Sequence, residues 1–317
     1  MKLLVIRPWL ILILIGAIPM FDSRAADPSN SLPKASIVKT ITPPLMTKRE
    51  TARVTALPGK EIKLIDQTNE FTLFLPTAWN AAAADEIVLT VHFLGGVRMV
   101  INEHLRRGLK EPLLVASFKG LSSVYRIPFE DRERFARLIK LVEKTLKENG
   151  AQEKAHITAV DISSASAGYG AVREILKSPE YVKIIRRIVL CDSIYADYAP
   201  AVPNQPRQPA DKSIDPWLPF ARAAMRGEKT FVLTHSDNPV GSYASTGECA
   251  AALIQKLRAP VSARRAPGSP DDFSLRYRSD AGNFHIWGYG GIGGAAHGTH
   301  LSHLADTWMA LDAAGKP

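Results

Sequence analysis

The sequence predicts an α/β fold with a mostly parallel central sheet, antiparallel N-terminal strands and flanking helices. Three features support this prediction. Short segments of alternating polar and apolar residues come first, as in half-exposed antiparallel strands. Continuous apolar runs follow, as expected of strands that are covered on both faces. These runs alternate with helix-like segments, and strand–helix alternation is typical of a parallel sheet flanked by helices.

The N-terminus resembles an export signal. Lys2 and Arg7 give a positively charged start, residues 9–21 are almost wholly apolar, and Ser23-Arg24-Ala25 supplies small residues before a cleavage point. The apolar run is short for a membrane span, so we expect no stable span after signal removal. An uncleaved anchor is the alternative. We therefore expect a signal peptide over residues 1–25.

The remaining chain divides into two parts. Residues 26–48 are rich in Pro, Ser and Thr and lack periodicity, which predicts a flexible segment. Residues 49–317 have the length and patterning of one large domain. Removing residues 1–25 lowers the net charge from +9 to +7. No Lys/Arg block is interleaved with aromatic residues, so nucleic acid is not expected as a partner.

The chain has two cysteines, Cys191 and Cys249. An oxidising compartment would permit a disulfide between them. Cys191, however, ends an apolar strand-like run, where a buried thiol behaves as a small hydrophobic group. The pairing is therefore left open. Neither cysteine has a second one at metal-ligand spacing.

The first half of the domain contains short strands, then buried strands, then a helix. Alternating segments at residues 53–57, 62–65 and 70–76 predict antiparallel edge strands. The apolar runs 87–93 and 113–118 predict buried strands. Apolar residues fall on one stripe from about 130 to 148, which predicts a helix that Asn149-Gly150 ends.

The second half alternates strands and helices up to the C-terminus. The expected strands are residues 156–160, 184–191, 230–234 and 284–288. The expected helices are residues 171–176, 217–226, 247–257 and 295–311. Residues 261–272 are predicted to form a polar insertion, and Gly290 to Gly294 a glycine-rich loop.

One short motif carries the chemistry. Ser164-x-Ser166-x-Gly168 lies between the strand that starts at His156 and the helix that starts at Ala171. Strand, small-x-Ser-x-Gly and helix is the layout of a nucleophile elbow, in which a sharp turn lifts one hydroxyl above the sheet. The commonest form has Gly where this chain has Ser164, and an ordinary Ser/Ala/Gly turn is the alternative interpretation.

With these elements in order, the chain resembles an α/β-hydrolase over most of residues 50–315. The resemblance implies that Ser166 attacks an acyl carbonyl and that a histidine late in the chain is its base. His297 follows the glycine-rich loop and fits that place. His300 as the base, or a metal site on the His297, His300 and His303 helix face, are the alternatives. His285 lies within a strand and is expected to be packed in the core.

Two aspartates fit the acid that orients the histidine. The usual family acid follows the later strand, which favours Asp237 after residues 230–234. Some family members place it after the earlier strand, which favours Asp192 after residues 184–191. Asp192 leaves a buried strand directly, so its position should be rigid, whereas Asp237 lies in a turn-like Ser/Asn/Pro loop. We prefer Asp192, with Asp237 as the alternative acid.

The resemblance places an oxyanion hole after the 87–93 strand. The N–H groups of Gly96 and Ala167 would be its two donors. The usual His-Gly at this turn is Leu94-Gly95 here, so the sequence does not indicate which residue holds the loop in place. Aromatic residues near predicted strand ends are candidates for a pocket lining. They are Tyr169, Tyr195, Tyr243 and Trp287.

The sequence thus predicts an exported serine hydrolase, periplasmic or secreted, that cleaves a small-molecule or envelope-derived carboxylic ester. It needs no cofactor and no metal, because the sequence contains neither a phosphate loop nor a metal-ligand cluster. An acyltransferase with the same three residues, or a binding protein on a hydrolase fold, are the alternatives.

Overall fold

The computed structural model describes residues 41–49, 57–83 and 85–315. The expected signal peptide and most of the expected strand at 53–57 lie outside the described residues. Residues 41–48, the described part of the segment expected to be flexible, contact the domain: Ile41 and Met46 are buried, and the Tyr289 hydroxyl donates to the Pro44 carbonyl at 2.8 Å. No helix within the described ranges is long and apolar enough to cross a membrane.

A nine-stranded mixed sheet forms the centre of residues 39–317, in the order β1-β2-β4-β3-β5-β6-β7-β9-β8. The N-terminal strands pair antiparallel, β3 to β7 and β9 pair parallel, and β8 pairs antiparallel with β9 at the far edge. The predicted fold class is therefore confirmed. The strands are β1 (Gly59–Asp66), β2 (Asn69–Pro76), β3 (Glu86–Phe93), β4 (Leu113–Ala116), β5 (His156–Ala165), β6 (Ile185–Cys191), β7 (Thr230–His235), β8 (Leu275–Ala281) and β9 (Phe284–Tyr289).

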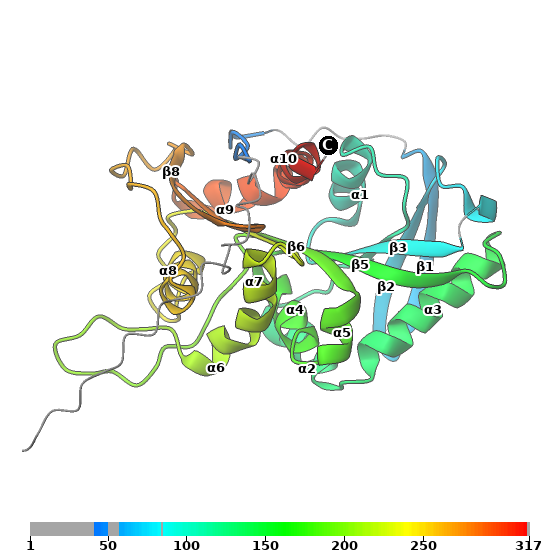
Figure 1. Ribbon diagram of the computed structural model, residues 1–317, viewed down its shortest axis with the longest axis horizontal. Helices are drawn as coiled ribbons and strands as arrows, with labels where there is room; N and C mark the ends of the chain where they lie inside the picture. The colour runs from blue at the N-terminus through cyan, green and yellow to red at the C-terminus, as the bar shows by residue number, and fades with distance from the viewer. Residues whose placement is uncertain (1–40, 50–56, 84, 316–317) are drawn as a thin grey trace, which may run out of the picture. The chain divides into compact units, whose positions relative to one another are not determined.

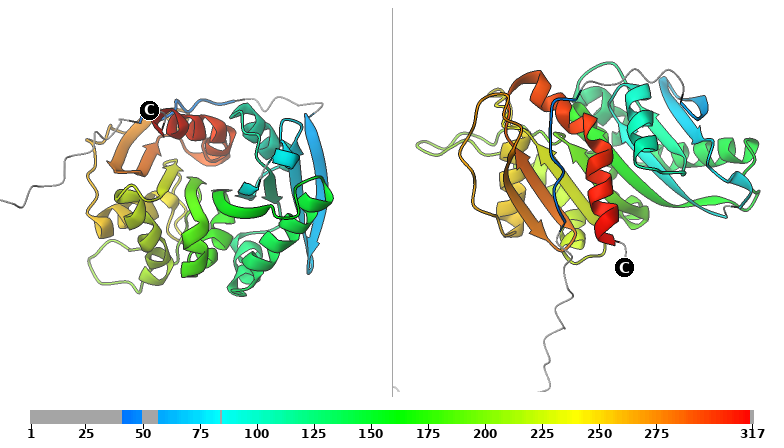
Figure 2. Two further views of the ribbon diagram at one scale, coloured as in Figure 1. Left: turned by 45° about the vertical axis from the view of Figure 1, so that its right-hand side comes forward. Right: turned by 90° about the horizontal axis from the view of Figure 1, so that it is seen from above.

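Helices cover both faces of this sheet. In Figures 1 and 2, α1, α9 and α10 lie on one face and the remaining helices on the other. The central strands are apolar on both sides because both are covered: Val91, Leu190 and Leu233 are fully buried. The helices are α1 (Val97–Arg106), α2 (Ser122–Glu130), α3 (Arg134–Glu148), α4 (Tyr169–Ile175), α5 (Pro179–Ile184), α6 (Asp211–Ile214), α7 (Leu218–Met225), α8 (Thr246–Leu257), α9 (Gly293–Ser302) and α10 (Leu304–Gly315).

The structure differs from the sequence-based expectation in several elements. β8 was not predicted, because Arg276, Arg278 and Asp280 give its segment a polar character. Those charges are paired at the sheet edge, for example Arg278 with Asp280. Helices α1, α2, α5 and α6 were not predicted either, and the expected final helix is broken in two at His303, whose ring contacts Thr47 and Asp306.

Gly168 fixes how closely α4 approaches the sheet. A Cβ at this position would lie 2.3 Å from the carbonyl oxygen of Phe93, at the end of β3. A backbone atom of a central strand cannot move away cheaply. The sequence pattern small-x-Ser-x-Gly is therefore required here by packing as well as by the turn.

We expect Gly168→Ala to lower the free energy of unfolding by about 1–3 kcal/mol, the usual cost of overpacking a core. The matched control is Gly298→Ala in α9, where a Cβ meets nothing within 4 Å. That variant should stabilise slightly, by up to about 1 kcal/mol. Urea unfolding of both variants checks this, and equal stabilities would contradict the packing argument.

Candidate active site

Ser166 lies in a strained turn between β5 and α4. It begins a short 3-10 helix, Ser166–Gly168, and its φ is +45°. Non-glycine residues adopt such positive φ values rarely, and the strain persists only where the surroundings impose it. A serine in this conformation between a strand and a helix is the geometry of a nucleophile elbow.

Two buried serines hold this turn. The Ser193 hydroxyl donates to the carbonyl oxygen of Ser166 at 2.8 Å, and the Ser164 hydroxyl lies 2.8 Å from that of Ser193. Since Ser193 already donates to Ser166, Ser164 is the donor in the second bond. The residue that replaces the usual glycine thus supports the elbow through a hydrogen bond to the turn after β6.

Asp192 lies at that turn, directly after β6, with a φ of +47°. Its carboxylate is almost fully buried, and Oδ2 accepts hydrogen bonds from His297 Nδ1 at 3.0 Å and from Ser236 Oγ at 2.6 Å. Burial alone would raise the pKa of Asp192, but the bonds and the neighbouring imidazoles lower it to about 2. Asp192 is therefore ionised throughout the neutral range.

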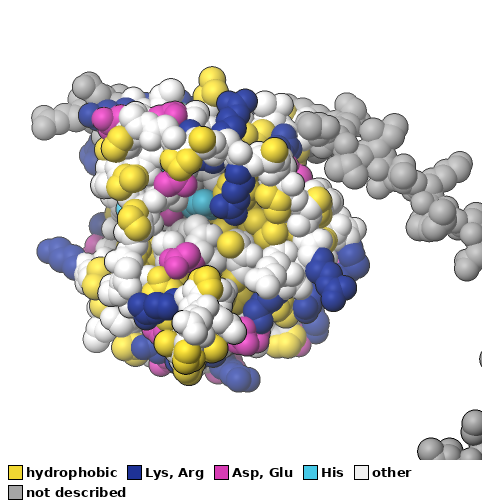
Figure 3. Space-filling view, turned by 90° about the vertical axis from the view of Figure 1, so that its left-hand side faces the viewer, with side chains coloured by type: hydrophobic (Ala, Val, Ile, Leu, Met, Phe, Trp, Pro, Cys, Tyr) yellow, Lys and Arg dark blue, Asp and Glu magenta, His cyan; other side chains and the backbone are white. Residues whose placement is uncertain are grey.

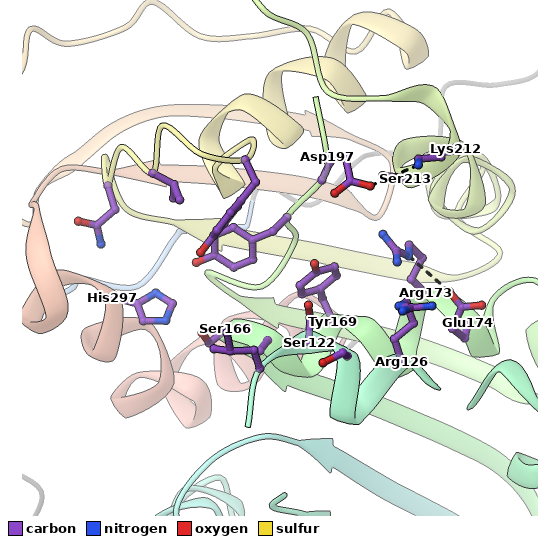
Figure 4. A pocket seen from close by; sticks show the side chains of 18 of the residues that line it. Ser122, Arg126, Ser166, Tyr169, Arg173, Glu174, Asp197, Lys212, Ser213 and His297 are labelled. Carbon is purple, nitrogen blue, oxygen red and sulfur yellow. Dashed lines mark ion pairs between the residues drawn. The ribbon is translucent and has the colours of Figure 1, made fainter. Parts of the chain in front are cut away.

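His297, in the first turns of α9, is the histidine that meets this carboxylate. The hydrogen bond to Asp192 raises the pKa of His297 above 6.5, against the opposing effect of burial. Because Nδ1 donates to Asp192, Nε2 is the nitrogen left free to accept a proton. His297 and Ser166 line the same pocket, where Figure 4 shows the imidazole facing the Ser166 side chain.

The alternative acid, Asp237, does not reach the histidine. Its side chain is 38% exposed, its Oδ2 lies 3.7 Å from Arg276 Nε, and its backbone N–H donates to Gly291. No contact between Asp237 and His297 is present in the described part of the chain. Of the two aspartates named from the sequence, Asp192 is the one that the structure brings to His297.

The other histidines point elsewhere. His300 is buried with Nδ1 2.9 Å from Thr234 Oγ1, and burial lowers its pKa to about 4. His303 contacts Asp306 and the Thr47 backbone. His285 is packed beside Asp280 within the core, as expected. Among the described residues, no three His, Cys, Asp or Glu side chains are grouped as metal ligands.

The loop after β3 leaves the sheet beside the elbow, because Phe93 pairs with Ser164. Leu94 has a φ of +67°, and its carbonyl oxygen accepts a hydrogen bond from His92 Nε2 at 2.8 Å. Burial lowers the pKa of His92 to about 4, so the ring is neutral, and its Nδ1 accepts from Ser163 at 2.7 Å. His92 thus supports the loop whose support the sequence left open. Gly96 caps α1 in this loop but, unlike Ala167, does not line the pocket.

The pocket has a volume of about 1020 Å³. Tyr169, Tyr195 and Tyr243 line it and contact one another in sequence, with ring centroids 5.6 Å apart in each pair. Trp287 does not line it: the expectation was wrong, because this side chain is fully buried in the core. A space-filling view shows a histidine in a hollow surrounded by hydrophobic and charged side chains (Figure 3).

The sequence did not single out Ser236, Ser193 or His92 as supporting residues. Ser236 follows β7 directly and Ser193 follows Asp192, so both occupy carboxyl ends of parallel strands, where site residues gather. Their place directly after parallel strands was the sequence feature that could have identified them. The two cysteines are unpaired and buried in different parts of the core.

No family model matches the chain, and no curated protein matches it in sequence. An uncharacterised protein from Capnocytophaga ochracea DSM 7271 is similar in structure, with 12% identity and a TM-score of 0.47 over 82% of this chain and 65% of that one. The feruloyl esterase module from Clostridium thermocellum, complexed with sinapinate, shows 9% identity and a TM-score of 0.48 over 87% and 96%. A thermostable esterase from Pseudomonas putida ECU1011 shows 12% and 0.43 over 83% and 82%. These likenesses say nothing about what this chain binds or cleaves.

The fold class rests on the chain's own architecture. The mostly parallel sheet has an antiparallel N-terminal edge, and a serine at positive φ joins β5 to α4. An aspartate and a histidine follow later, in the chain order Ser, Asp, His that accompanies the nucleophile elbow. The resemblance inferred from the sequence is confirmed at this level, and the chain has the α/β-hydrolase fold.

Proposed function

We propose that the protein is a serine hydrolase that cleaves carboxylic esters. Ser166 is the nucleophile, His297 the general base and Asp192 the residue that orients the imidazole. One observation carries the proposal: the Nδ1 of His297 lies 3.0 Å from Asp192 Oδ2 beside a pocket that Ser166 also lines. A buried acid, a half-buried imidazole and a strained serine that share one site form the arrangement that acyl transfer requires.

The reaction proceeds through an acyl-enzyme. Ser166 Oγ attacks the ester carbonyl while His297 Nε2 takes its proton, and a tetrahedral intermediate forms. The proposed donors to its oxyanion are the N–H group of Ala167, which lines the pocket, and that of Gly96, which lies in the loop after β3 and outside the pocket lining. His297 then protonates the leaving alcohol, and water repeats the sequence to release the acid. Asp192 stays ionised and stabilises the imidazolium in both steps.

A panel of activated esters, measured with and without an added alcohol, tests this function. We expect a burst of nitrophenol followed by steady turnover, since acylation precedes slower deacylation. Predominant transfer to the alcohol instead of water would identify an acyltransferase. Failure to release nitrophenol and to react with a fluorophosphonate would support the binding-protein alternative.

The pH dependence follows from the His297 pKa. The imidazole must be neutral to accept the serine proton, so kcat/KM should rise with pH through the pKa of His297 and then level off. Asp192 raises that pKa above 6.5, so the rise should centre above 6.5. Removing the carboxylate charge in Asp192→Asn should move the midpoint of the residual activity to lower pH. An unmoved midpoint would contradict the pairing.

We also propose that the protein is exported and that residues up to Ala25 are removed. The support is the charged start, the apolar run and the small residues at 23–25. Intact mass of the protein isolated from its native compartment should correspond to a chain that begins at Ala26. A mass that includes Met1 would mean that the segment stays attached as an anchor.

A further inference from the structure

The pocket extends well beyond Ser166 and His297 into a charged end. Seven charged side chains other than His297 line it, from α2, α4, α6 and the loops beside them. The basic ones are Arg126, Arg173, Lys177 and Lys212, and the acidic ones are Glu130, Glu174 and Asp197. Figure 4 shows Arg126 and Arg173 near Tyr169, on the opposite side of that ring from His297.

All four of these basic side chains form an ion pair with an acidic one. Arg126 donates to Glu130, Lys177 donates to Glu174, and Lys212 lies 3.4 Å from Asp197. The side chains in the pairs of Arg126, Lys177 and Lys212 are well exposed, apart from that of Glu174. Solvent therefore screens these three ion pairs, and each contributes little energy.

Arg173 forms the longest of these four ion pairs. Its side chain is only 14% exposed, and its Nε lies 3.6 Å from Glu174 Oε1, which is too far for a hydrogen bond. The other carboxylate oxygen of Glu174 is held by Lys177. No hydrogen bond from the Arg173 guanidinium to another described residue is present. The N–H groups on the two terminal nitrogens of this mostly buried guanidinium are therefore available to a ligand anion in the pocket.

Tyr169 and Arg173 contact each other on α4. The two residues are four apart on α4 and therefore share one face of the helix. The guanidinium carbon lies 5.6 Å from the centre of the Tyr169 ring, within the range of a cation–π contact. Burial raises the pKa of Tyr169, so its ring stays neutral. Arg173 is seven residues beyond Ser166, about 10 Å along a helical path.

We propose that Arg173 binds an anionic group, a carboxylate or a phosphate, on the ester substrate. Two parallel N–H donors of a guanidinium match the two oxygens of such a group. The substrate class is then an ester that carries a negative charge at the end remote from the scissile bond. This inference rests on the proposed function, because Ser166 and His297 define which bond is scissile.

Paired substrates measure this preference. Mono-p-nitrophenyl glutarate and p-nitrophenyl pentanoate have acyl chains of equal length, but only the first carries a carboxylate. We expect wild-type kcat/KM to favour the glutarate ester, and Arg173→Gln to reduce the glutarate/pentanoate ratio by about tenfold or more, the loss typical of a charge-assisted pair. Arg173→Lys should retain part of the ratio, because the charge remains and the fork is lost.

The matched control is Arg222→Gln. Arg222 is an exposed arginine on α7 that does not line the pocket, so the variant removes the same charge elsewhere. It should leave the ratio within about twofold, because exposed charges beyond a Debye length are screened. An equal ratio in wild type and Arg173→Gln would overturn the proposal. So would an equal fall in Arg173→Gln and Arg222→Gln, since only the net charge would then matter.

A binding measurement separates this inference from the proposed function. Calorimetry on Ser166→Ala, with glutarate and with 4-phosphonobutyrate as probes, requires no turnover. We expect at least one probe to bind and Arg173→Gln in the same background to weaken it about tenfold or more. The tighter probe distinguishes carboxylate from phosphate. Binding that needs Arg173 in a protein without esterase activity would keep this inference and reject the proposed function. Failure of both probes to bind, with esterase activity intact, would do the reverse.

Discussion

Ser166→Ala is expected to lower kcat for an activated ester by about 10⁴-fold or more, the size of loss seen when a triad nucleophile is removed. The change deletes one oxygen, so KM should change little. Ser166 lines the pocket beside His297 and occupies the strained turn that exposes its hydroxyl. Steady-state kinetics with p-nitrophenyl esters measures the loss, and thermal unfolding checks that the variant is folded.

The matched variant is Ser164→Ala. Ser164 is fully buried and its hydroxyl supports the elbow through Ser193, so this change should weaken the turn and reduce activity far less than the loss of Ser166. If Ser164→Ala abolished activity while Ser166→Ala did not, the nucleophile would have been assigned to the wrong serine of the motif.

Asp192→Asn should reduce kcat by about 10³–10⁴-fold with the fold intact. The Asn amide presents a donor to Nδ1 of His297, which favours the tautomer with its proton on Nε2, and that nitrogen can no longer accept the serine proton. Ser236 donates to the same carboxylate oxygen, Oδ2, which helps to keep the side chain at position 192 oriented toward His297.

Asp237→Asn is the control for this prediction. Asp237 is partly exposed and its carboxylate lies beside Arg276 rather than beside His297. We expect a loss of no more than about threefold, as for a surface substitution away from the site. A severe loss for Asp237→Asn with a mild one for Asp192→Asn would transfer the role to the later strand and would require a different loop arrangement during turnover.

The sequence predicted those elements whose structure depends on residues close together in the chain. The apolar runs marked the central strands because a strand covered on both faces has no polar side to show. The nucleophile elbow could be predicted because both its sharp turn and its close packing on Phe93 require small residues within the five positions 164–168. β8 escaped notice because its paired charges gave it the composition of a loop.

The choice between the aspartates could not be made from the sequence. Asp192 and Asp237 follow β6 and β7, which are neighbours in the sheet, so each reaches the same edge. What distinguishes them is the path of the β7–α8 loop, which turns Ser236 toward Asp192 and Asp237 toward Arg276. The proposed role of Arg173 could not be predicted from the sequence either. Which of its N–H groups lack an acceptor is known only from the structure, in which α2, α4 and α6 surround one pocket.

Mass mapping of a fluorophosphonate adduct tests the central assignment most directly. Trypsin should release residues 155–173 as one peptide that contains Ser163, Ser164 and Ser166. The account predicts one adduct per chain, localised by fragmentation to Ser166 and lost from His297→Ala, because the unassisted hydroxyl is a poor nucleophile. An adduct on Ser163, on Ser164 or on any other peptide, or the absence of an adduct from folded wild-type protein, would contradict it.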